Sequence, residues 1–146
     1  MELTTDQKGA IAESAVIHAA AKLGIGVYKP ISDGERYELI LDLRPPLLRV
    51  QCKWARLSAE VVIVRCYSCR RSASGMVVRP YTADEADAIA AYCPDTDRCY
   101  LLSPDVFDGR RAVQLRIVPS RNNQRLGVNW ADDFAFEARM AALLGP

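Results

Sequence analysis

The first strong pattern in the chain is an apolar stretch with helical periodicity at residues 8–24 (KGAIAESAVIHAAAKLG). Thr4, followed three residues later by Gln7, has the spacing of a capping box and predicts where the helix starts, and Gly24 predicts where it ends. Apolar side chains surround this segment on nearly all sides, which is typical of a buried helix. We therefore expect it to pack against the core.

Glu13 is the charged residue that this pattern makes conspicuous. Its neighbours three, four and seven positions away are Ala10, Ile17 and Ala20. Its carboxylate is therefore expected to be partly withdrawn from water, which is costly without a nearby cation or hydrogen-bond donor. The alternative is that Glu13 lies at the edge of the apolar face and reaches water.

Two segments further along alternate with the period of β-strands. In residues 37–43 (YELILDL), one face carries Tyr37, Leu39, Leu41 and Leu43, and the other carries Glu38, Ile40 and Asp42. In residues 47–55 (LLRVQCKWA), Gln51 and Lys53 share one face, with Val50, Cys52 and Trp54 on the other. Pro45 and Pro46 force a turn between them, so the two segments predict an antiparallel hairpin.

The remaining segments complete an α+β arrangement. Residues 82–93 are compatible with a helix or, in their second half, with a strand that pairs across PDTD with residues 98–102, and the hairpin-like spacing favours the strand. The other expected elements are a short strand within residues 24–30, a third meander strand at 59–68, a helical turn at 103–107, an edge strand at 112–118, a turn at 120–125, and a last helix capped by Asn129. We expect a mixed, largely antiparallel sheet flanked by an N-terminal and a C-terminal helix, in a single domain spanning residues 1–146.

Charge is strongly segregated along the chain, although the net charge is only +1. Residues 44–80 contain eight basic residues and one acid, whereas residues 81–109 contain seven acids and one arginine. Such segregation indicates a face that binds polyanions, with solvated strands as the alternative explanation.

Composition limits the class of protein further. The chain has no apolar run long enough for a membrane helix, and its polar, acidic start differs from a signal peptide, so we expect an intracellular protein of the cytoplasm, at the nucleoid when bound to DNA. Its five cysteines are expected to be reduced thiols. The CxxC spacing of Cys66 and Cys69, with Cys93 and Cys99 downstream, leaves a zinc-stabilised interaction domain as a distant alternative.

Four polar residues form a set with a chemical purpose: Glu13, Glu38, Gln51 and Lys53. Glu38 and the Gln51/Lys53 pair lie on neighbouring strands of the predicted hairpin and are expected on the same face. Oxygen ligands suit a hard divalent ion such as Mg²⁺, with Mn²⁺ as a substitute. The expected ligands are Glu38, the Gln51 amide oxygen, the backbone carbonyl of Cys52 and, directly or through water, Glu13. Lys53 would then steady a scissile phosphate or help to deprotonate an attacking water.

This pattern resembles the PD-(D/E)XK nuclease superfamily, and more closely its branch of small group I intron homing endonucleases, in which Gln replaces the second acid of the motif. The resemblance is carried by the helix with Glu13, by GERYELILDL with Glu38, by LRVQCKWA with Gln51 and Lys53, and by DAIAAYCPDTDRCYLLSPDVF and RNNQRLGVNWADDF downstream. It implies an α/β/α-like restriction-endonuclease core and a Mg²⁺-dependent enzyme that hydrolyses DNA phosphodiester bonds and leaves a 5′-phosphate. It also implies a dimer or tetramer, since one small domain carries one site.

One residue departs from the pattern of the superfamily, which normally has Asp at the position of Glu38. The extra methylene of glutamate moves the carboxylate by about one bond length, and Asp42 on the same strand face is the alternative ligand. Five arginines are expected to contact the DNA backbone: Arg49, Arg56, Arg65, Arg70 and Arg71.

Two alternative functions remain besides the zinc-stabilised domain, together with one purely structural hypothesis. A structure-selective junction or repair nuclease would act on branched rather than double-stranded DNA. A catalytically weak nucleic-acid-binding module would retain DNA binding after decay of the site. In the simplest structural hypothesis, Glu38 and Lys53 only form a surface salt bridge across the hairpin, worth under about 1 kcal/mol.

Overall fold

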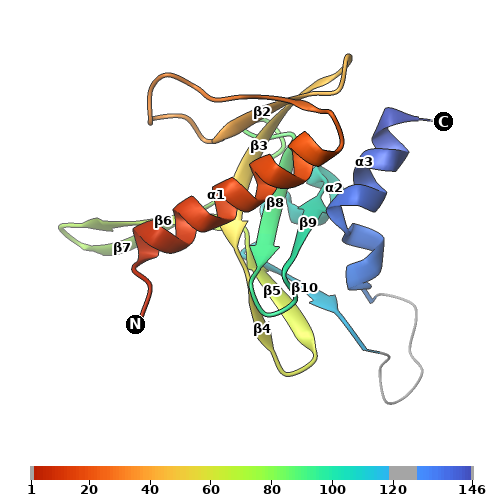
Figure 1. Cartoon of the computed structure of the whole chain (residues 1–146). Coiled ribbons are helices and arrows are strands. Elements are labelled where there is room, and N and C mark those ends of the chain that lie inside the picture. Colours follow the sequence, from red (N-terminus) through yellow and green to blue (C-terminus); the bar gives the residue numbers. More distant parts are fainter. Residues whose placement is uncertain (1, 119–127, 146) are drawn as a thin grey trace.

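A five-stranded mixed sheet forms the centre of the molecule in the computed structural model, which describes residues 2–118 and 128–145 (Figure 1). Its strand order is β1 (Gly26–Tyr28), β2 (Leu39–Asp42), β3 (Leu47–Trp54), β8 (Ala88–Cys93) and β9 (Arg98–Leu102). Adjacent strands are antiparallel except for β3 and β8, which are parallel. The expected mixed, largely antiparallel sheet is therefore confirmed.

The first helix, α1 (Thr5–Lys22), begins and ends close to where the sequence predicts. The Thr4 side chain accepts a hydrogen bond from the Gln7 backbone, and the Gln7 side chain accepts one from Thr4, which completes the capping box. Gly24 follows the helix with a φ of +74°, a conformation that glycine adopts without strain.

The two faces of the sheet are covered by different layers. On one face, α1 and α3 (Phe136–Leu144) pack on a core that includes Val16, Leu39, Val50 and Met140. On the other face, a second sheet of β10 (Ala112–Arg116), β5 (Val61–Arg65) and β4 (Arg56–Ser58) packs on a core with Phe107 of the short helix α2 (Pro104–Phe107). Both terminal helices thus flank the sheet, as expected, and both contribute to the same core.

The predicted meander is wrong at its third strand. After β3 the chain leaves the central sheet, and the segment expected as that strand is divided between β5 and β6 (Tyr67–Ser72), which belong to other sheets. β8 takes the position beside β3. The reason is burial: Ala88 to Ala91 are buried on both faces of β8, and such a strand is stable in the middle of a sheet. The expected pairing of β8 with β9 across PDTD is confirmed.

The C-terminal elements agree in part with the prediction. The helical turn α2 and the edge strand β10 are present. The last helix does not begin after Asn129: a short 3-10 helix, η1 (Ala131–Phe134), comes first, and α3 starts at Phe136. The Asn129 carbonyl instead accepts a hydrogen bond from the Arg116 backbone. The turn expected at residues 120–125 lies outside the described residues.

A two-stranded ribbon formed by β6 and β7 (Gly75–Pro80) projects from the body beside the N-terminal half of α1 (Figure 1). Most of its residues from Cys69 to Arg79 are exposed. Within the described ranges, no helix is long and apolar enough to cross a membrane.

Burial in the central sheet gives a direct test of the fold. Leu41 on β2 has no exposed surface, whereas Leu47 at the start of β3 is 61% exposed. Leu41→Ala should lower the free energy of unfolding by about 3 kcal/mol, because it removes buried contacts and leaves a cavity. Leu47→Ala should change it by less than about 0.5 kcal/mol. Urea unfolding of both variants measures the difference, and equal effects would contradict the assigned faces of the hairpin.

Candidate active site

A local irregularity between β2 and β3 sets the position of Glu38. Leu39 is the β2 residue that pairs with Val50, yet the Glu38 backbone N–H also donates to the Val50 carbonyl, at 2.9 Å. Two consecutive residues therefore oppose one, which is the arrangement of a β-bulge and re-aims the side chains around it. We expected Glu38 on the face of Gln51 and Lys53, but its carboxyl lies beside Glu13 of α1, on the helix-covered side.

The side chains of Glu38, Glu13 and Lys29 form a cluster of interacting charges between α1 and the start of β2. Burial, a hydrogen bond with Glu13 and the charge of Glu13 together raise the pKa of Glu38 from 4.5 to about 7, while Lys53 and Lys29 act in the opposite direction. The Glu13 side chain is 20% exposed and forms an ion pair with Lys29, which follows β1. The hydrogen bond and charge of Glu13 raise the pKa of Lys29 in turn. The sequence-based expectation that Glu13 is partly desolvated is confirmed.

Beyond Val50, β3 has an open edge. In an antiparallel pair, the N–H and C=O of one residue point to the same neighbouring strand, so the backbone groups of Cys52, like those of Val50, point toward the side of β2. β2 pairs with β3 only as far as Val50. The Cys52 N–H is instead bound by the side-chain oxygen of Gln51, at 2.9 Å. The Cys52 carbonyl is directed to the same open edge, next to Glu38.

Gln51 is the buried polar residue of the sheet, with 6% of its surface exposed. Besides the contact of its oxygen with Cys52, its amide nitrogen donates to the Tyr81 hydroxyl at 2.6 Å. Both ends of the amide are therefore held, and the nitrogen contact and the oxygen contact fix the same orientation. The amide oxygen keeps a second lone pair at the open edge of β3.

Lys53 extends to the opposite side of this edge. Its Nζ donates to the backbone carbonyl of Tyr67 at 2.8 Å and lies 5.0 Å from the centre of the Tyr81 ring. Among the described residues, no carboxylate forms an ion pair with Lys53. The cross-strand salt bridge with Glu38, which only the alternative structural hypothesis required, is therefore absent from the described part of the chain, and the lysine charge acts on Glu38 from a distance.

A hollow of about 610 Å³ brings these groups together between α1, β3 and the base of the ribbon. Acidic Glu38 and basic Lys53 both line it, beside Cys52. Arg56 and Arg65, two of the five predicted DNA-contacting arginines, line it as well, together with Lys8. Glu13 and Glu38 share a second, smaller hollow with Lys29 on the other side of the carboxylate pair. The two acids therefore separate a basic hollow from a smaller acidic one.

Other predicted residues lie elsewhere. Arg49 is held by Asp87 through two side-chain contacts at 3.1 Å, and by the Asp84 carbonyl at 2.9 Å. Asp42 accepts a hydrogen bond from the Arg44 backbone in the β2–β3 turn, at the far end of β2 from Glu38, so it is not placed to replace that ligand. Arg70 and Arg71 are exposed on the ribbon.

Besides Lys29, two residues on the Lys53 side of the site could not be found from the sequence. Tyr81 contacts Gln51, lies near Lys53 and stacks with Arg36, whose guanidinium carbon is 4.1 Å from the ring centre. Arg36 also binds Glu85 at 3.0 Å. Burial alone would raise the pKa of Glu85, but hydrogen bonds from Arg36 and Thr82 outweigh it and lower the pKa. The hydrogen bonds from Gln51 to Tyr81 and from Arg36 to Glu85 join positions 30 and 49 residues apart, and no local pattern marks them.

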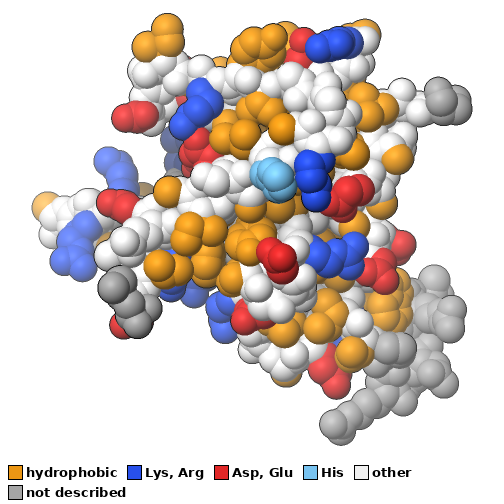
Figure 2. All heavy atoms as spheres, in the orientation of Figure 1, with side chains coloured by type: hydrophobic (Ala, Val, Ile, Leu, Met, Phe, Trp, Pro, Cys, Tyr) orange, Lys and Arg blue, Asp and Glu red, His pale blue; other side chains and the backbone are white. Residues whose placement is uncertain are grey.

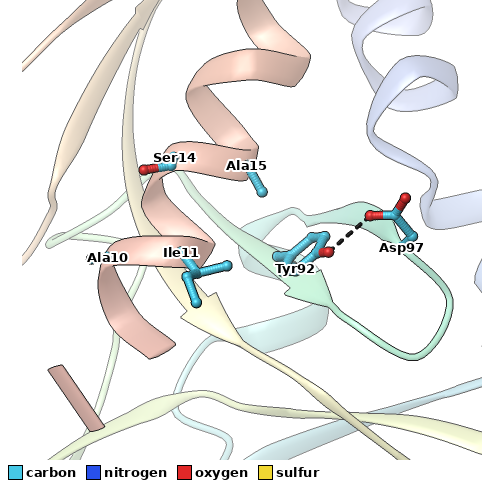
Figure 3. A pocket seen from close by; sticks show the side chains of 6 residues that line it. All are labelled: Ala10, Ile11, Ser14, Ala15, Tyr92 and Asp97. Atoms are coloured by element: carbon cyan, nitrogen blue, oxygen red, sulfur yellow. Dashed lines mark hydrogen bonds between the residues drawn. The ribbon is translucent and has the colours of Figure 1, made fainter. Parts of the chain in front are cut away.

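A separate hollow lies between α1 and the β8–β9 turn (Figure 3). It is lined by Ala10, Ile11, Ser14, Ala15, Tyr92 and Asp97. The one carboxylate there accepts a hydrogen bond from the Tyr92 hydroxyl at 2.8 Å, so the hollow lacks the combination of acid and base that the first one has.

The fit of the site to a divalent cation depends on mixed oxygen ligands. Among the described residues, no group of three or more His, Cys, Asp or Glu side chains is arranged to hold a metal ion, and all five cysteines are free thiols. At the open edge of β3, the Glu38 carboxyl lies beside Glu13 and shares a hollow with Cys52, whose backbone N–H is bound by the Gln51 amide oxygen. Hard cations such as Mg²⁺ bind through one or two carboxylates together with neutral oxygens, so the residues present fit such an ion.

The chain belongs to the PD-(D/E)XK endonuclease family, whose model matches residues 3–137. This family uses divalent metals, and the chain is therefore a nuclease of that class. The fold is also similar to that of the bacterial homing endonuclease I-Ssp6803I, with a TM-score of 0.76 and 25% sequence identity over 94% of this chain and 93% of that one. No curated protein sequence matches the chain.

The raised pKa of Glu38 predicts a pH dependence of stability in the metal-free protein. Below about pH 4.5 the folded and unfolded chains both hold the proton, and between about pH 4.5 and 7 the folded chain retains a proton that the unfolded chain has released. The stabilisation linked to Glu38 should therefore be lost as the pH rises through about 7. In chelator, Tm should fall across this range, and Glu38→Gln should flatten the curve. Identical slopes for both proteins would show that Glu38 titrates normally.

Proposed function

We propose that the chain is a divalent-metal-dependent endonuclease that hydrolyses phosphodiester bonds in DNA, with Mg²⁺ as its ion and Mn²⁺ as a substitute. The observation that carries this proposal is that Glu38, whose carboxyl lies beside Glu13, lines one basic hollow together with Lys53 at the open edge of β3. The similar solved structure is that of a homing endonuclease, which supports DNA as the substrate.

Glu38, the Cys52 carbonyl and the Gln51 amide oxygen would hold the ion, with Glu13 bound directly or through water. A divalent ion bound there supplies charge neutralisation at the phosphate and an acidified water. Glu13 and Glu38 would compensate the charge of the ion, and Glu38 would have to give up the proton that its carboxyl retains below pH about 7. Metal binding should therefore weaken as the pH falls below 7.

Lys53 is placed to act on the phosphate itself. Its Nζ has a neutral carbonyl and an aromatic face as neighbours, so its charge remains available for a phosphate oxygen. A cation in this position stabilises the negative charge that develops in the transition state. Arg56 and Arg65, exposed at the rim of the same hollow, would hold the flanking phosphates and set the register of the DNA without reading its sequence.

A single site of this kind cuts one strand. We therefore propose that the chain acts on double-stranded DNA as a dimer or tetramer, in which symmetry places one site at each strand. A structure-selective nuclease would share the same catalytic residues and differ in substrate, and branched DNA tests that alternative.

Cleavage assays on supercoiled plasmid and branched DNA test the proposed chemistry. The wild-type protein should cut in Mg²⁺ or Mn²⁺ and not in chelator. Lys53→Ala and Glu38→Gln should each lower the cleavage rate by about 100-fold or more, since each removes a group that acts in the transition state. Lys22→Ala, which removes an exposed charge at the far end of α1, should leave the rate unchanged.

Binding measured in the same tubes separates the alternatives. Lys53→Ala should still bind duplex DNA within a few-fold of wild type. A wild-type protein that binds DNA equally well in chelator and in metal, and cuts neither substrate, would contradict the enzyme and favour the nucleic-acid-binding module.

A further inference from the structure

We infer that the β6–β7 ribbon is a DNA-reading arm that enters the major groove next to the cleaved phosphate. This inference rests on the proposed function, because it takes DNA as the substrate, and it assigns to the ribbon a recognition role separate from catalysis. The ribbon comprises Tyr67–Ser72 and Gly75–Pro80, paired antiparallel from Tyr67↔Pro80 to Ser72↔Gly75.

The ribbon has no buried face of its own. Its residues are exposed or half-buried throughout, and an isolated two-stranded hairpin is only marginally stable in water. Met76 is 59% exposed and Val77 is 37% exposed, which is unusual for large apolar side chains on a projecting element. Such a surface is what a binding element presents before its partner covers it.

The ribbon is positively charged, which indicates the kind of partner it binds. Residues 61–83 contain no acid, and the ribbon carries three arginines: Arg70, Arg71 and Arg79. Arg79 is engaged with Glu85 at 2.6 Å, whereas Arg70 and Arg71 are exposed toward the tip. Lys and Arg side chains colour the projecting element blue in Figure 2. A polyanion is therefore the complementary partner.

The pairing of side chains along the ribbon matches the chemistry of the major groove. Arg70 lies across from Val77, and Arg71 lies across from Met76, so each face carries one arginine beside one apolar side chain. The major groove is wide enough for a two-stranded ribbon, and it offers acceptors on guanine to arginine and the thymine methyl group to apolar side chains. Two six-residue strands are about 20 Å long, which is enough to cross several base pairs.

The base of the ribbon is fastened to the active site on both strands. Arg36 donates to the Ser68 hydroxyl on β6 and to the carbonyls of Arg79 and Pro80 on β7, at 3.2 and 3.0 Å. Lys53 Nζ donates to the Tyr67 carbonyl at the first residue of β6. Ser68 and Cys69 also line the basic hollow with Glu38. The arm therefore has a fixed direction relative to the catalytic lysine, and docking it in the groove positions the phosphate.

Binding of a generic 40-base-pair duplex in chelator tests the arm without cleavage. Arg70→Gln/Arg71→Gln should weaken binding by about tenfold or more and reduce the salt dependence by about two ions. Arg44→Gln removes an exposed arginine from the β2–β3 turn and should change neither quantity. Methyl green, which occupies the major groove, should compete with wild type, whereas netropsin, which occupies the minor groove, should not.

A second variant tests the apolar side chains of the ribbon, and thermal melting checks that all variants are folded. Met76→Gln/Val77→Thr keeps both arginines, so it should retain the salt dependence of wild type and its preference for guanine over 7-deazaguanine. It should lose the preference for a thymine-containing duplex over the same duplex with uracil, which lacks the methyl group. Thermal melting should place all three variants within a few degrees of wild type, since the substituted side chains are exposed.

Three results would overturn the inference. The first is that the arginine variant binds DNA as tightly as wild type. The second is that netropsin, and not methyl green, competes with the wild-type protein. The third is that the arginine variant loses binding although methyl green has no effect on wild type, which would mean that the arginines contact only the DNA backbone. Failure of the nuclease proposal is distinguishable, because it would leave these chelator measurements intact and abolish only metal-dependent cleavage.

Discussion

The site depends on how far β2 extends along β3. β2 pairs with β3 only as far as Val50. Leu39 is the β2 residue that pairs with Val50, and the Glu38 N–H donates a hydrogen bond to the carbonyl of the same residue. The bulge turns Glu38 toward α1, and the end of the pairing leaves the backbone of Cys52 without a neighbouring strand. Carboxylate, amide and carbonyl oxygens therefore meet at one open edge. Had β2 continued in register, its backbone would have used the Cys52 groups, and no edge would remain for a ligand.

Bringing two carboxylates together at a half-buried edge is electrostatically unfavourable, and the surrounding structure compensates for it. Lys29 pairs with Glu13, and a retained proton relieves Glu38 near neutral pH. A divalent cation would relieve both acids at once, which links the folding energetics of the edge to its chemistry. On the other side of β3, Tyr81 and Arg36 hold Gln51, Lys53 and the ribbon as one group. The positions proposed for catalysis and for DNA recognition thus share a single support.

Local patterns, together with the resemblance to the nuclease superfamily, indicated the candidate residues of this site, whereas features that depend on distant contacts were missed. An isolated acid in an apolar helix identified Glu13, and strand alternation placed Gln51 and Lys53 on one face. Alternation also placed Glu38 on that face, because a bulge breaks the period of two and leaves no mark in a single sequence. The prediction of a three-strand meander was wrong for a related reason. β8, which is buried on both faces, takes the place beside β3, and this long-range pairing cannot be predicted from a single sequence. Tyr81, Arg36 and Lys29 act through contacts that no spacing along the chain reveals.

If the open edge of β3 is a metal site, a crystal structure of the protein grown with Mn²⁺ should show the ion there. Anomalous scattering locates the ion independently of the model for the protein. We predict one Mn²⁺ bound to the Glu38 carboxylate and the Cys52 carbonyl, with Glu13 in direct or water-mediated contact, and no such peak in Glu38→Gln. An edge without Mn²⁺ at saturating concentration would contradict a metal site at this place.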